Sequence, residues 1–193
     1  MQVFPLFQGI MSRCKVYYRL SQSLQLTKAF VQLAADVGAW GVKIRPNGLP
    51  KDVPEDKTLR QIAGAAKECG EFAKDKGIVL FMECHGGGTS DPARMATIME
   101  HCNHPSVCLC WNCNGIDVKG GSIREAFELC KPWIQHLHIH DLYERYPYRE
   151  LFDLLKAMKF GRYTMIEMGA TSDPVRVLRY YRALWEAFVS GAG

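Results

Sequence analysis

The feature that most constrains the fold is a repeated order of a short apolar segment followed by an amphipathic one. Five segments have the length and composition of β-strands, and each is followed by apolar residues at helical spacing. A repeated strand–helix order favours parallel strands joined by right-handed crossovers. The second segment is apolar without alternation, as in a strand that helices cover on both faces. The predicted strands are 41–45, 78–83, 107–111, 133–140 and 163–167.

Apolar residues recur at intervals of three and four between these strands. We predict an irregular N-terminal segment over residues 1–30, inside which the first helix begins at Leu24, and a single domain over residues 31–193. Gly38 and Gly77 end the first two helices. The predicted helices are 24–37, 57–75, 91–101, 123–129, 148–158 and 174–189.

A polar side chain appears at or near the carboxyl end of four predicted strands, at Glu83, Asn112, His138 and Glu167. In a (β/α)8 barrel these ends converge on one mouth, where the active site lies. A doubly wound open sheet is the alternative. It is disfavoured because polar residues end four strands and are not confined to a single switch point. The expected fold class is therefore α/β, of the (β/α)8 TIM-barrel type.

Three of the six histidines alternate with apolar residues in the segment 136–141. Alternation has the period of a strand, so the three imidazoles share one face. A solvent-facing antiparallel strand would also read this way. At the end of a buried barrel strand, His138 becomes the ligand candidate, His140 lies nearer the mouth, and His136 lies deeper as a structural residue.

Two carboxylates, an amide oxygen and an imidazole suit a divalent cation such as Mn²⁺ or Mg²⁺, with Co²⁺ or Zn²⁺ as alternatives. The candidate ligands are Glu83, Asn112, His138 and Glu167. Strand alternation adds a check: if Glu83 points inward, His85 does too. His85 and His140 are then expected to contact a substrate or to support the ligands.

Charge and cysteine content exclude several classes of protein. The net charge of +4 resides in the first 35 residues, which hold four basic residues and no acid, so the rest of the chain is neutral. That balance argues against nucleic acid, and no run is long enough to span a membrane. Several of the eight cysteines lie in apolar runs, and Cys110-x-x-Cys113 stands alone without a second pair to form a zinc site. Reduced cysteines indicate a cytoplasmic setting. The acid-free start loosely resembles a transit peptide, with a divergent or truncated N-terminus as the alternative.

The chain resembles the xylose isomerase-like barrels, the sugar isomerase and epimerase superfamily that also contains endonuclease IV-type enzymes. The resemblance runs from about Ala34 to Glu167, over most of the chain. The order and spacing of the matching pieces carry it more than any one of them does. The pieces are 41–45, 83–86, 104–107, 111–112, 134–141 and 161–167.

The resemblance implies that the fourth, fifth, sixth and eighth strands supply Glu, Asp, His and Glu to one metal ion. Glu83, His138 and Glu167 match, whereas Asn112 stands where the family usually has Asp. The implied activity is sugar or sugar phosphate isomerisation or epimerisation of a small carbohydrate through an enediolate. Glu83 and Glu167 would exchange the proton as catalytic groups.

The same resemblance implies that three further side chains bind the substrate. They are Arg45, His85 and His140. A structural salt bridge is the alternative role for Arg45. A keto-polyol dehydratase could use the same site, and a catalytically degenerate barrel acting as a binding module is a third alternative, favoured by Asn112.

Nuclease activity is disfavoured, because the related nucleases need further histidines on earlier strands and none of the six precedes His85. A complete barrel runs about 250 residues. If 41–45 is the third strand, the first two strand–helix units are missing or replaced. We expect an incomplete barrel whose open edge invites pairing with a second copy of the chain.

Overall fold

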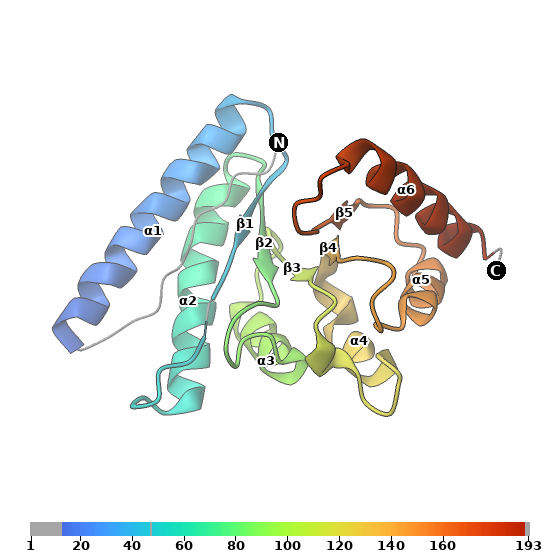
Figure 1. Cartoon of the computed structure of the whole chain (residues 1–193). Helices are drawn as coiled ribbons and strands as arrows, with labels where there is room; N and C mark the ends of the chain where they lie inside the picture. The colour runs from blue at the N-terminus through green and yellow to red at the C-terminus, as the bar shows by residue number, and fades with distance from the viewer. Residues whose placement is uncertain (1–12, 47, 192–193) are drawn as a thin grey trace.

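The computed structural model describes residues 13–46 and 48–191, which form one sheet and its covering helices (Figure 1). Two short 3-10 turns, η1 (Gly115–Asp117) and η2 (Lys131–Trp133), flank the fourth helix. The main elements in chain order are α1 (Arg13–Asp36), β1 (Gly41–Ile44), α2 (Glu55–Lys74), β2 (Val79–Glu83), α3 (Pro92–Cys102), β3 (Val107–Trp111), α4 (Arg124–Cys130), β4 (Ile134–Ile139), α5 (Tyr148–Ala157), β5 (Thr164–Ile166) and α6 (Pro174–Ser190).

The sheet has the strand order β1-β2-β3-β4-β5, and every neighbouring pair is parallel. Spatial order therefore follows chain order without the reversal that defines a doubly wound sheet. The expected α/β class is confirmed as an incomplete TIM barrel, with five strands in the part of the chain that the structure describes.

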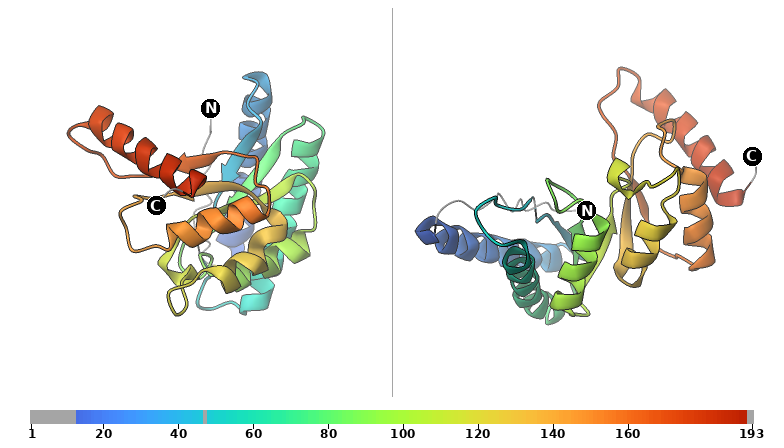
Figure 2. Two further views of the ribbon diagram at one scale, coloured as in Figure 1. Left: turned by 90° about the vertical axis from the view of Figure 1, so that its right-hand side faces the viewer. Right: turned by 90° about the horizontal axis from the view of Figure 1, so that it is seen from below.

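The helices cover one side of this sheet and contact each other in sequence. α1 packs on α2, α2 on α3, α3 on α4, and α5 on α6. Figures 1 and 2 show α1 and α6 at opposite ends of this row. Between the helices and the sheet lies the main apolar core, to which the strands contribute alternate residues such as Leu80, Leu109 and Leu137.

The other face of the strands is small and partly polar. Phe81, Cys108 and Cys110 form a second buried cluster there, against which Trp40 packs. Polar side chains at the same alternation are also buried, namely Lys43, Glu83, His136 and His138. This inward face, corresponding to a barrel interior, brings the candidate site residues together.

The N-terminal helix is longer than the sequence predicts. α1 begins at Arg13, so the expectation of an irregular segment over residues 1–30 is wrong for 13–30. No glycine or proline occurs between Ile10 and Val37, so nothing in the chain stops the amphipathic helix from extending backward. Residues 1–12 of the expected segment lie outside the described residues.

Glu167 follows a strand that lies next to β4. The resemblance places its counterpart on the eighth strand, whereas here β5 pairs directly with β4 and residues 140–163 contain α5 but no strand. The two edge strands also differ: all four residues of β1 are buried, and those of β5 are half-buried or exposed. Among the described helices, none combines the length and apolar character needed to cross a bilayer.

Candidate metal centre

Three of the four predicted ligands meet at the carboxyl end of the sheet. Glu83 is the last residue of β2, His138 lies in β4, and Glu167 directly follows β5. Nδ1 of His138 lies 3.0 Å from Oε1 of Glu83 and 2.9 Å from Oε2 of Glu167. The ligand atoms of the three side chains all lie within 4.8 Å of one another, which is compatible with one shared cation.

Two cationic side chains from the β1 side also contact this group. Nζ of Lys43 lies 2.9 Å from Oε2 of Glu83, and Nε of Arg45 lies 2.5 Å from the same oxygen. The Arg45 guanidinium also reaches Oε1 of Glu167 at 3.6 Å. Sequence reasoning missed Lys43, although its alternation with Arg45 places both on one face of the strand.

These contacts fix the charge of Glu83 and the tautomer of His138. Burial opposes ionisation of Glu83, but hydrogen bonds from His138 and Lys43 and the charges of these groups prevail and lower its pKa to about 2. A carboxylate only accepts hydrogen bonds, so Nδ1 of His138 carries the proton that faces Glu83 and Glu167. Metal ligation through Nδ1 requires that proton to leave.

The fourth predicted ligand, Asn112, directly follows β3. β3 and β4 pair Trp111 with Leu137, so continuing this register by one residue places Asn112 level with His138. The side chain of Asn112 is buried, and its Oδ1 has no hydrogen-bond partner among the described residues. A buried, unpaired amide oxygen is costly, and ligation of a cation would satisfy it.

The predicted substrate-binding residues border the same group. Arg45 bridges Glu83 and Glu167, which fits the salt-bridge alternative, but it remains about one-fifth exposed. Nε2 of His140 lies 4.0 Å from Oε2 of Glu167, beyond hydrogen-bond length. His85 is half-buried in the loop after β2, and burial together with the nearby charge of Arg45 lowers its pKa.

The donor set suits a divalent cation. Two carboxylates and an imidazole nitrogen, with an amide oxygen at the same level, match the ligands that Mn²⁺ and Mg²⁺ share with borderline ions such as Co²⁺ and Zn²⁺. Glu83 is fully buried, whereas the Glu167 side chain is 42% exposed. Solvent therefore reaches the centre from the Glu167 side, and a small polar molecule could approach it from there.

Solved structures of similar fold include several sugar epimerases. An L-ribulose 3-epimerase superposes with a TM-score of 0.80 at 15% identity, over 94% of this chain and 71% of that one. A 3-keto-D-glucoside 4-epimerase from E. coli gives 0.74 at 15% identity, over 89% and 73% of the two chains. A xylose isomerase-like protein from Mycobacterium smegmatis in complex with magnesium gives 0.63 at 14% identity, over 100% and 85%.

At these identities the structural matches establish the fold. No curated protein matches the sequence. The sequence model of the family described as xylose isomerase-like TIM barrel matches residues 19–184, which is most of the chain. The resemblance inferred from the sequence motifs is thereby confirmed, and the chain belongs to the xylose isomerase-like TIM barrel family.

Proposed function

We propose that this protein binds a divalent metal ion and isomerises or epimerises a sugar or sugar phosphate through an enediolate. The observation that carries the proposal is the convergence within 4.8 Å of Glu83 from β2, His138 from β4 and Glu167, which directly follows β5. The epimerase neighbours support a small carbohydrate as the substrate class.

The two carboxylates are suited to different parts of such a reaction. When bound, the ion would act as a Lewis acid toward substrate oxygens. Glu83 is fully buried and is held by Lys43, Arg45 and His138, so its position is fixed. Glu167 is partly exposed, so it can reach a substrate carbon beside the carbonyl and exchange a proton with it.

The groups at the rim supply substrate recognition. Arg45 offers donors for a hydroxyl or a phosphate oxygen, and both its partners, Glu83 and Glu167, are candidate ligands. A cation on these carboxylates would compete with the guanidinium and free it to contact the substrate. His140 and His85 border the same group of carboxylates and complete the proposed set of substrate-binding residues.

Mn²⁺ or Mg²⁺ is the proposed ion, because oxygen donors dominate the set and a magnesium-bound structure occurs among the neighbours. Asn112 in place of the family's Asp removes one negative charge, so weaker binding is expected. We also place the protein in the reducing cytoplasm, which is supported by the seven cysteines between Cys69 and Cys130, all of which are free.

Metal binding is tested by equilibrium dialysis and by thermal unfolding with and without Mn²⁺. An ion at 100 times its Kd stabilises a protein by about 2.7 kcal/mol. We expect His138→Ala to abolish both bound metal and stabilisation. His101→Ala, which alters an exposed residue of α3, is the matched control and should change neither. Equal binding by both variants would refute the proposed centre.

Activity is tested by incubating a panel of ketoses and ketose phosphates with the Mn²⁺-loaded protein in D₂O. Proton exchange predicts deuterium at the carbon beside the carbonyl, with product of unchanged elemental composition apart from that label. Loss of water from the product would favour the dehydratase alternative. Metal binding without deuterium uptake across the panel would favour a degenerate barrel that serves as a binding module.

A further inference from the structure

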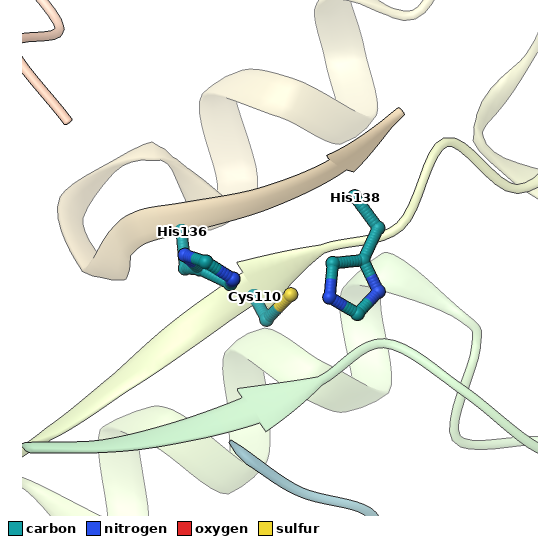
Figure 3. A group of neighbouring side chains, drawn as sticks. All are labelled: Cys110, His136 and His138. Carbon is teal, nitrogen blue, oxygen red and sulfur yellow. The ribbon is translucent and has the colours of Figure 1, made fainter. Parts of the chain in front are cut away.

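A second group of side chains able to ligate a metal shares His138 with the first. Cys110 of β3 and His136 and His138 of β4 have ligand atoms within 4.8 Å of one another (Figure 3). In Figure 3 the sulfur of Cys110 lies between the two imidazole rings. The pairing of Cys110 with His136 across β3 and β4 brings the trio together, just after a register shift at Leu109.

All three side chains are buried in the inward cluster of the sheet. Cys110 is fully buried, and its thiol donates a weak hydrogen bond of 3.8 Å to the carbonyl oxygen of Trp111. A metal ion takes an imidazole in its neutral form, through the ring nitrogen that carries no proton.

We propose that Cys110, His136 and His138 form a second metal site, selective for thiophilic ions of the Zn²⁺ and Cd²⁺ class. One sulfur and two imidazole nitrogens are the donors that such ions prefer over oxygen, and three protein ligands leave a fourth position open. The metal–sulfur bond forms as the Cys110 thiol releases its proton to solvent, so no oxidant or reductant is required.

His138 belongs to both groups through different nitrogens. Its Nδ1 contacts Glu83 and Glu167, and Figure 3 shows its other ring nitrogen, Nε2, turned toward Cys110. A neutral imidazole has one free lone pair, so ligation through Nε2 keeps the proton on Nδ1, and ligation through Nδ1 keeps it on Nε2. A thiophilic ion at Cys110 and an oxygen-preferring ion at the carboxylates therefore exclude each other.

The sulfur site is tested with Co²⁺ and Cd²⁺, whose thiolate complexes give charge-transfer absorption. We expect this absorption in the wild type, its loss in Cys110→Ser and Cys110→Ala, and a fall in Cd²⁺ affinity of more than about tenfold, since even partners that only support a ligand are worth 10–100-fold. Cys108→Ser is the matched control, because Cys108 is buried in the same strand and cluster but lies outside the trio.

Circular dichroism identifies any variant that fails to fold, and having two substitutions at Cys110 keeps the test open if one does fail. Absorption that persists in both folded Cys110 variants, or that disappears equally in Cys108→Ser, would overturn the sulfur site. Its loss in the Cys110 variants alone upholds it, whether or not Mn²⁺ binds at all.

The mutual exclusion of the two ions rests on the proposed carboxylate centre, and it is therefore tested in a separate experiment. Titration with Mn²⁺ should raise the apparent Kd for Cd²⁺ in proportion to the Mn²⁺ concentration, and Glu167→Gln should remove this competition while keeping the thiolate absorption. Independent binding of the two ions would overturn the sharing of His138. Absence of any Mn²⁺ binding would refute the proposed function and leave the Cys110 result standing on its own.

Discussion

Lys43 and Glu83 form an ion pair of 2.9 Å in which both side chains are almost completely buried. Removing one partner of a buried pair leaves an uncompensated charge and costs up to about 3–5 kcal/mol. We expect Lys43→Met to destabilise the metal-free protein toward the lower end of that range, because Arg45 and His138 still contact Glu83. Urea unfolding in EDTA measures this change.

The same variant has a second expected effect. Loss of the Lys43 charge makes the centre more negative, so Mn²⁺ should bind Lys43→Met more tightly than wild type and restore part of the lost stability. Lys28→Met is the control, because its pair with Glu68 is partly exposed and worth at most about 1 kcal/mol. A Lys43 variant as stable as the Lys28 variant would contradict the importance of the buried pair.

Asp117 is expected to make stability depend on pH. It is buried in η1, and burial raises its pKa to about 7 although hydrogen bonds from Tyr146 and from the amide of Asn114 act in the opposite direction. The folded state therefore binds this proton more tightly than the unfolded state. Stability from this group is fully present below about pH 4, falls by at most about 1.4 kcal/mol per unit as pH rises to 7, and is constant above.

The contribution of Asp117 is isolated by comparing urea unfolding of wild type and Asp117→Asn between pH 4 and 8. The variant keeps an oxygen for both donors but cannot ionise, so its stability should fall less steeply. Asp153→Asn, at an exposed position of α5, should follow the wild-type curve. Parallel curves for wild type and Asp117→Asn would show that the Asp117 proton is not linked to folding.

Two glycines of α2 should respond in opposite directions to alanine. A Cβ at Gly70 would lie 2.6 Å from Nδ1 of His104 and 2.7 Å from Cγ2 of Val107, closer than packed atoms approach. We expect Gly70→Ala to destabilise by about 1–3 kcal/mol. Gly64→Ala has open space around it and should stabilise by about 0.5–1 kcal/mol through helix propensity. Chemical unfolding measures the free energy of unfolding of both variants. A stabilised Gly70→Ala would contradict the close packing of α2 on β3.

The β5 edge is where we expect two copies of the chain to pair. β5 is the exposed edge of the sheet, with Met165 and Ile166 each 38% exposed. Sedimentation velocity over a range of concentrations should detect self-association, and Met165→Lys should weaken it at least about tenfold by placing a charge on the edge. Val37→Lys, at the end of α1, is the control. A wild type that is monomeric throughout the range would exclude this pairing.

Most helices and strands could be predicted from the local sequence, because the spacing of apolar residues is regular within each of them. β3 is apolar throughout and stands between Pro105 and a polar turn, and the prediction of 107–111 is confirmed. The prediction began α1 too late, at Leu24, because the basic and aromatic residues before it were taken as irregular. Val16, Leu20 and Leu24 stand four residues apart, so the helical spacing extends further back than the prediction did.

Site residues that depend on pairing between strands were harder to predict. Glu83, His138 and Glu167 could be chosen because each ends or nearly ends a strand, and the structure brings them together. Lys43 was missed because a lysine inside a short strand normally faces solvent. The neighbours of Cys110 depend on the β3–β4 register and its shift at Leu109, which no sequence pattern reveals.

We expect the short, exposed strand β5 to be the part of the centre that opens most often. Glu167 extends the β4–β5 ladder through a 2.9 Å bond from its amide to the carbonyl of Ile139, at the end of a strand with no buried residue. Fraying of this strand would withdraw Glu167 while Glu83 and His138 stay in place. Amide exchange in β5 should then be faster than in β2 or β4, and a bound ion would slow it by tying the edge of the sheet to its centre.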